Sequence, residues 1–176
     1  MAAFDYESYI KDIPDYPEPG VIFKDITPLF ADATALRTAI DDMADHFKDA
    51  GVTKVIGPEA RGFMVGVPMA IALNAGFIPA RKPGKLPRET YSMTYELEYG
   101  TDTLEIHQDA IQPGDRVLVA DDLVATGGTA AATAKLIREV GGELVGYSFI
   151  LELCYLGPRE LLTADGTELY SLVKVQ

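Results

Sequence analysis

Apolar runs and segments with helical spacing alternate along the chain. The runs lie at residues 54–57, 77–80, 117–120, 143–153 and 169–175. Apolar runs of this kind predict strands that are buried on both faces of a parallel sheet. Strands that alternate with helices are typical of an α/β fold with a doubly wound, mostly parallel sheet. In such folds, ligands bind at the carboxyl ends of the strands.

Helical spacing is clearest between residue 32 and about Ala50. Apolar residues recur there every three or four positions, at Leu36, Ile40, Met43 and Phe47. Either Asp32 or Thr34 can cap the start of this helix, and Gly51 is placed to end it. Further helices are predicted after the loop at 58–62 and over 127–140, and short ones at 4–10 and after Gly157.

Two segments fall outside this alternation. Residues 89–106 carry a strand-like aromatic pattern around a turn at Gly100, which predicts a β-hairpin appended to the α/β core. Three prolines and a glycine interrupt regular structure between residues 14 and 20. The extended apolar segment that follows, 21–28, is interpreted either as core packing or as an edge strand.

Length and composition restrict the class of protein. A chain of 176 residues with 48% hydrophobic content can form one domain with a full core. A net charge of −12 argues against general binding to nucleic acid or to a membrane surface. The single cysteine, Cys154, cannot form an internal disulfide, and no apolar run reaches transmembrane length. Since the N-terminus resembles no signal peptide, we expect a cytoplasmic protein.

The richest chemistry lies in residues 116–130, which read RVLVADDLVATGGTA. A buried strand is followed by Asp121 and Asp122, then by a loop of small residues, then by a helix. Backbone N–H groups at the start of a helix can hold a phosphate, and glycines let the backbone approach it closely. An ordinary strand-to-helix turn would leave the two carboxylates unexplained. The sequences typical of nucleotide-hydrolase P-loops and dinucleotide-binding folds are both absent.

One segment is basic against this acidic background. Arg81, Lys82, Lys85 and Arg88 follow a predicted strand and are interspersed with prolines and a glycine. Most charge runs are solvated loops, but here the position after a strand favours anion binding.

Residues 116–130 resemble the PRPP-binding signature of the type I phosphoribosyltransferases. Other stretches resemble, in order, the adenine-specific branch of that family. These stretches are Pro19 to Ile26, Glu59 to Phe63, Arg81 to Pro87, Leu97 to Gly100 and Leu151 to Leu153. The resemblance implies one domain over residues 1–176, in which about 1–30 and 82–106 form the base-binding parts and a hairpin hood over the site.

The resemblance also implies which residues would bind each part of the substrates. The ribose hydroxyls would be held by Asp121 and Asp122, and the 5′-phosphate by Ala125, Thr126, Gly127, Gly128 and Thr129. Pyrophosphate would be bound by Glu59, Ala60 and Arg61, whose loop can contain a cis peptide, and by Arg81, Lys82 and Lys85. The adenine pocket would consist of Ile22, Phe23, Lys24, Ala125 and Leu153. Glu98 would be the acid/base at the purine.

Two residues depart from the pattern or compete with it. Many relatives have arginine at the position of Lys24, which weakens the role implied for that side chain. Glu96 lies two positions before Glu98, on the same face of a predicted strand, so the assignment of Glu98 depends on the Tyr99-Gly100 that follows it. Without the resemblance, Glu98 would be interpreted as an exposed strand glutamate.

The resemblance implies transfer of the 5-phosphoribosyl group from PRPP to adenine, giving AMP and pyrophosphate. Mg²⁺ would arrive with PRPP, because no His, Cys and carboxylate cluster has metal-ligand spacing. A homodimer is expected, in which Arg81 reaches the neighbouring site. One alternative is a phosphoribosyltransferase for a 6-oxopurine. Another is a non-catalytic PRPP-sensing regulator, which would need a DNA-binding extension and a basic face that this sequence lacks.

Overall fold

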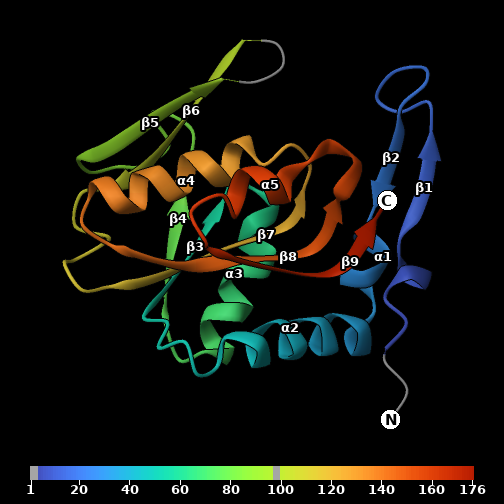
Figure 1. The fold of residues 1–176 in the computed structure, drawn as a ribbon, viewed down its shortest axis with the longest axis horizontal. Helices are drawn as coiled ribbons and strands as arrows, with labels where there is room; N and C mark the ends of the chain where they lie inside the picture. Colours follow the sequence, from blue (N-terminus) through green and yellow to red (C-terminus); the bar gives the residue numbers. More distant parts are fainter. Residues whose placement is uncertain (1–3, 97–99) are drawn as a thin grey trace.

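Five parallel strands form the centre of the protein, in the order β4-β3-β7-β8-β9 (Figure 1). The computed structural model describes residues 4–96 and 100–176. The strands are β3 (Lys54–Pro58), β4 (Gly76–Ala80), β7 (Arg116–Val124), β8 (Glu143–Leu153) and β9 (Glu168–Val175). All neighbouring pairs in this sheet are parallel. The predicted doubly wound α/β fold is therefore confirmed.

Helices cover both faces of the sheet (Figure 1). One face carries α2 (Ala33–Phe47) and α3 (Arg61–Ala72), and the other α4 (Gly128–Glu139) and α5 (Pro158–Leu162). Side chains of β7 alternate between the faces: Leu118 packs in the α2–α3 core and Val119 in the α4 core. Asp32 caps α2, since its carboxylate accepts hydrogen bonds from two backbone N–H groups of the first turn.

Two antiparallel hairpins extend from this core. The predicted hairpin is confirmed as β5 (Thr90–Glu96) and β6 (Thr101–His107), and it joins the core through paired backbone hydrogen bonds between Arg81 and Glu105. The other hairpin pairs β1 (Lys11–Pro14) with β2 (Ile22–Asp25). The segment at 21–28 thus contains an edge strand, and its partner β1 ends at the first of the prolines that argued against regular structure.

Three local predictions differ from the structure, and two short elements were not predicted. The helix expected at 4–10 is a single 3₁₀ turn, Glu7–Tyr9, and a short helix, α1 (Thr27–Ala31), was not predicted. A second 3₁₀ turn, Cys154–Leu156, precedes α5. The helix expected to reach Ala50 ends at Phe47. The acidic pair lies inside β7 rather than after it, because pairing with β8 continues as far as Val124.

The helices of the described residues are too short to span a membrane. The helix α2 has 15 residues, and α3 and α4 have 12 each. Within residues 4–96 and 100–176, no helix is both long enough and apolar enough to cross a bilayer.

Candidate active site

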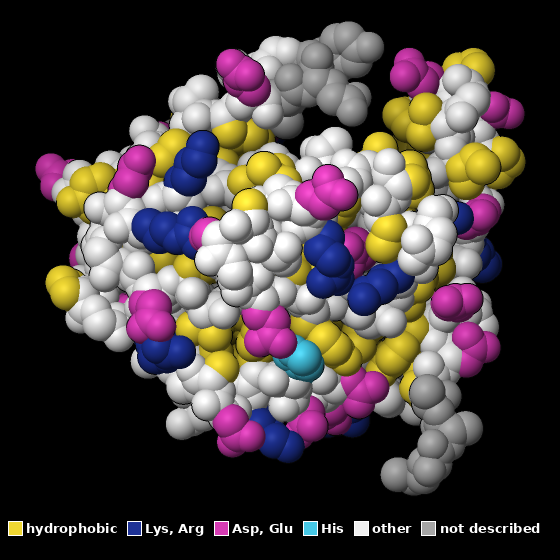
Figure 2. Space-filling model, in the orientation of Figure 1, with side chains coloured by type: hydrophobic (Ala, Val, Ile, Leu, Met, Phe, Trp, Pro, Cys, Tyr) yellow, Lys and Arg dark blue, Asp and Glu magenta, His cyan; other side chains and the backbone are white. Residues whose placement is uncertain are grey.

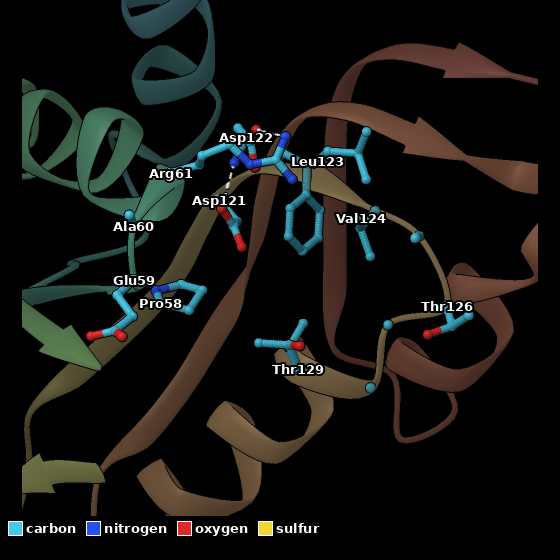
Figure 3. A pocket seen from close by; sticks show the side chains of 15 residues that line it. Pro58, Glu59, Ala60, Arg61, Asp121, Asp122, Leu123, Val124, Thr126 and Thr129 are labelled. Atoms are coloured by element: carbon cyan, nitrogen blue, oxygen red, sulfur yellow. Dashed lines mark hydrogen bonds and ion pairs between the residues drawn. The ribbon is translucent and has the colours of Figure 1, made fainter. Parts of the chain in front are cut away.

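A pocket opens where the strand order reverses. The chain passes from β3 outward to β4 and then returns to β7 on the other side of β3. Crevices at such switch points, outside the carboxyl ends of the strands, are the usual ligand sites of open α/β sheets. The pocket here has a volume of about 260 Å³ and is lined by residues 58–61 and 121–130 together with Phe149 (Figure 3).

Glycines bring the two sides of this pocket close together. A Cβ atom on Gly57 would lie 2.5 Å from the carbonyl oxygen of Gly62. A Cβ atom on Gly62 would lie 2.7 Å from Pro58 Cδ and 3.1 Å from Asp121 Oδ1. Because no side chain fits at these positions, the end of β3 presses against the start of α3. The peptide bond between Glu59 and Ala60, in the connecting loop, is cis.

The acidic pair and Arg61 form the charged centre of the pocket (Figure 3). The backbone N–H of Asp122 donates to Asp121 Oδ1 at 2.8 Å. Arg61 Nη1 lies 3.1 Å from Asp122 Oδ2, but this carboxylate oxygen has no well-directed hydrogen bond within the described residues. Only 1% of Asp122 is exposed. A buried carboxylate oxygen that has an ion pair with Arg61 but no hydrogen bond from the described part of the chain is suited to a ligand that donates hydrogen bonds, such as a sugar hydroxyl.

Burial raises the pKa of both carboxyl groups. For Asp121 the pKa lies well above the ordinary value, because of burial and then because of repulsion from Asp122. For Asp122 burial also raises the pKa, and Arg61 opposes that shift. The ligand-free protein therefore holds negative charge here at a cost in stability.

That cost gives a first prediction: Asp121→Asn should stabilise the ligand-free protein. A carboxyl whose pKa is raised by folding binds its proton more tightly in the native state, so the free energy of unfolding falls as pH rises above about 3.8, the ordinary value. Asparagine removes the charge and can still accept the N–H of Asp122. Each kcal/mol gained raises the melting temperature by about 2–4 °C in a chain of this size.

Thermal unfolding between pH 4 and pH 8 measures this effect. The advantage of Asp121→Asn over wild type should grow with pH. A variant that melts below the wild type at pH 7, or an advantage that does not vary with pH, would contradict the proposed cost of the buried charge.

The small-residue loop forms the opposite wall of the pocket and leads into α4. Gly127 has a φ of 89°, in the left-handed region that favours glycine. Gly127 is also the N-cap of α4, and no side chain caps the helix at this position. The N–H groups of the first helical turn have no partner within the helix. The loop and helix start therefore present backbone donors at the pocket, as an anion site requires.

The basic segment lies beside this pocket, but three of its four cations, Arg81, Lys82 and Arg88, are held by carboxylates, Arg88 by Asp109. Arg81 Nε donates to Glu59 Oε2 at 2.6 Å, which ties the segment to the loop that carries Arg61. Lys82 Nζ lies 3.1 Å from Asp102 Oδ2, on the β5–β6 hairpin. The backbone carbonyl of Lys85 accepts a hydrogen bond from Arg81 Nη1 at 3.4 Å.

The residues expected around adenine lie on two neighbouring elements: Lys24 of β2 lines a pocket with Val175, and Val175 pairs with Leu153. Ala125 follows β7 and Leu153 ends β8, and both pack in the core cluster on the α2–α3 face. Ile22, Phe23 and Lys24 lie on β2, in the hairpin whose apolar side chains are exposed at the upper right of Figure 2. Within that hairpin, Phe23 packs edge-to-face on a tyrosine and Lys24 pairs with an aspartate of β1.

Some site residues could not be assigned or were missed. Glu98 lies outside the described residues, whereas Glu96 is the last residue of β5. Phe149 lines the pocket and was not predicted, although the register places it beside Asp121 on the neighbouring strand. Phe149 could have been identified by pairing the predicted strand at 143–153 with the strand that carries Asp121. Within the described residues, no group of three His, Cys, Asp or Glu could hold a metal.

Comparison with known proteins decides the family. Residues 27–152 match the family model described as the phosphoribosyl transferase domain. The chain is 58% identical, over 164 residues, to the adenine phosphoribosyltransferase of Sodalis glossinidius, covering 93% of this chain and 90% of that protein. The chain belongs to the adenine phosphoribosyltransferase family.

Two solved structures of adenine phosphoribosyltransferases share its fold. The enzyme of Thermoanaerobacter pseudethanolicus is 48% identical with a TM-score of 0.91, covering 97% of this chain and 98% of the other. The enzyme of Saccharomyces cerevisiae, solved with adenine and an imino-altritol bisphosphate, is 36% identical with a TM-score of 0.88, covering 95% and 96%. The similarity thus extends well beyond the PRPP-binding signature, over nearly the whole adenine phosphoribosyltransferase chain.

Proposed function

We propose that this protein transfers the 5-phosphoribosyl group from PRPP to adenine, giving AMP and pyrophosphate in purine salvage. One observation carries the proposal: the acidic pair, of which Asp122 is buried, and the small-residue loop line one pocket at the switch point of a chain that is 58% identical to an adenine phosphoribosyltransferase. The binding of adenine and a bisphosphate sugar analogue by the yeast relative supports the same substrates. Incubation with adenine, PRPP and Mg²⁺ should yield AMP and pyrophosphate in equal amounts, and absence of both products would contradict it.

The pocket suits the charges that develop in this reaction. Breaking the bond between the ribose C1′ and pyrophosphate builds positive charge on the ribose and negative charge on the leaving group. Asp121 and Asp122 would accept hydrogen bonds from the ribose hydroxyls and stabilise the positive charge. The loop at 125–129 would hold the 5′-phosphate, and the loop at 59–61, with its arginine, would hold pyrophosphate, to which Arg81, Lys82 and Lys85 would contribute.

The residues present fit Mg²⁺ that arrives with PRPP. Protein sites for Mg²⁺ usually supply one or two carboxylates, while waters and substrate phosphates complete the coordination. Asp121 and Asp122 border the pocket and would attract the ion, but Asp122 Oδ2 lies 3.1 Å from Arg61 Nη1, so PRPP itself would hold the metal. When bound, Mg²⁺ neutralises the charge that develops on the pyrophosphate.

Residues 1–176 would act as one domain, in which about 1–30 and 82–106 cover the part of the pocket that binds adenine. Glu98 would manage the proton at adenine N9, which is a weak nucleophile while that proton is in place. Covering the site would keep water away from PRPP and prevent its hydrolysis.

The role of Asp122 can be tested directly. Asp122→Asn should lower kcat/KM for PRPP about ten- to a hundredfold, because loss of a charge-assisted hydrogen bond costs about 1.5–3 kcal/mol. Steady-state kinetics, with circular dichroism as a control for folding, provide the measurement. Unchanged kinetics in a folded variant would remove the ribose assignment.

A homodimer is also proposed, on the expectation that Arg81 serves a neighbouring site. The outer face of α3 supports association, because it exposes apolar residues at helical spacing: Met64 (45%), Val67 (41%) and Ile71 (76%). Light scattering should give twice the chain mass of 19.1 kDa. Ile71→Glu should shift the protein towards monomer and lower its activity. A wild-type protein that is fully active as a monomer at assay concentrations would contradict the dimer.

A further inference from the structure

The β5–β6 hairpin contacts the first turn of α4 through Tyr95. The Tyr95 hydroxyl lies 3.2 Å from the Thr129 hydroxyl. A Cβ atom on Gly128 would lie 3.7 Å from the carbonyl oxygen of Glu96 and 3.9 Å from Tyr95 Cδ2. The end of β5 therefore packs directly on the loop end of α4. Within residues 4–96 and 100–176, Tyr95–Thr129 is the one side-chain hydrogen bond between the hairpin and this helix.

Thr129 has a second side, which lines the pocket opposite Arg61 (Figure 3). A threonine hydroxyl has one hydrogen to donate and two lone pairs that accept. If Tyr95 donates to Thr129 Oγ1, the Thr129 hydrogen is free to point into the pocket. A tyrosine hydroxyl is protonated at neutral pH and can act as this donor, and burial raises the pKa of Tyr95 further.

The residue opposite Tyr95 on the hairpin forms an ion pair with Lys82 of the basic segment. Tyr95 pairs with Asp102 across the two strands. Asp102 is in turn 3.1 Å from Lys82 Nζ and accepts the backbone N–H of Thr103 at 2.9 Å. Tyr95 and Asp102 therefore connect the small-residue loop, through Thr129, with the basic segment, through Lys82.

We propose that Tyr95 is a positioning residue for the 5′-phosphate of PRPP, acting through Thr129. Its hydroxyl donates to Thr129 Oγ1 and thereby directs the Thr129 hydroxyl hydrogen towards a phosphate oxygen. The inference rests on the proposed function, since it assigns the loop at 125–129 to the phosphate of PRPP.

Tyr95→Phe tests this role, because it removes the hydroxyl and keeps the ring that packs beside Gly128. The Kd for PRPP, measured by calorimetry with Mg²⁺ and without a purine, should rise about two- to tenfold, as expected for one lost hydrogen bond. The KM for adenine and the melting temperature should stay as in the wild type. Tyr91→Phe is the matched control: Tyr91 lies on the same strand, is 44% exposed, and its replacement should leave PRPP binding unchanged.

A double-mutant cycle separates positioning from general packing. Thr129→Ala should weaken PRPP binding, and adding Tyr95→Phe to it should weaken binding no further, because the tyrosine acts through the threonine. If the double variant weakened PRPP binding by the product of the two single effects, the proposal would be overturned. A wild type that binds PRPP no better than Tyr95→Phe would overturn the role of Tyr95 and leave adenine transfer standing. A wild type that binds no PRPP would overturn both.

Discussion

Replacing Glu98 with glutamine should lower kcat about 10²- to 10⁴-fold, the usual range for general acid–base assistance. Glutamine has nearly the same shape as glutamate but cannot take up or return the proton at adenine N9. The fold should be unaffected, so the variant should bind PRPP with wild-type affinity. Steady-state kinetics together with PRPP calorimetry would distinguish a chemical defect from a binding defect.

Glu96 provides the matched control, since it is the last residue of β5 and lies two positions earlier in the chain. Glu96→Gln should retain most of the activity. If Glu96→Gln is the inactive variant and Glu98→Gln the active one, the register of the Leu-Glu-Tyr-Gly motif has been assigned wrongly.

Adenine should be preferred over hypoxanthine by on the order of 10⁴ in kcat/KM. Adenine offers an N6 amino donor and an N1 acceptor, whereas hypoxanthine offers an O6 acceptor and an N1–H donor. Within the described residues β2 pairs only with β1, so the backbone groups on its other edge are available to a ligand. A backbone C=O and N–H that match adenine would meet hypoxanthine with donor against donor and acceptor against acceptor.

Lys24→Ala distinguishes this backbone mechanism from recognition by a side chain. Lys24 Nζ lies 2.6 Å from Asp12 Oδ1 on β1, so the substitution removes an ion pair that ties the two strands together. Activity should fall, but the preference for adenine should persist because the backbone groups remain. A variant that accepts hypoxanthine nearly as well as adenine would show that the lysine side chain sets the specificity.

Elements whose burial determines their structure could be predicted from the sequence. The central strands are evident from their apolar runs, and the sequence narrows the cap of α2 to Asp32 or Thr34, of which the structure shows Asp32. Pro28 ends the extended segment that the sequence predicts, but in the structure it lies in the first turn of α1, where its fixed φ is favourable. The exposed strand β1 carries no apolar pattern and depends on pairing with β2.

Contacts between distant segments could not be predicted. The acidic pair and the small-residue loop indicate a site within one stretch of sequence. The approach of the acidic pair to Arg61 depends on Gly57 and Gly62, which let β3 and α3 pack closely. The Tyr95–Thr129 contact likewise depends on how the hairpin lies over α4, which local patterns do not encode.

Adenine transfer by this protein can be tested most directly in one assay. The purified protein is incubated with PRPP and Mg²⁺ and with adenine, hypoxanthine, guanine or xanthine in turn, and nucleotide and pyrophosphate are quantified. Adenine should give AMP with an equal amount of pyrophosphate, and the three 6-oxopurines should give almost no nucleotide. Turnover of hypoxanthine within about tenfold of adenine, against the roughly 10⁴ expected, would contradict the assignment.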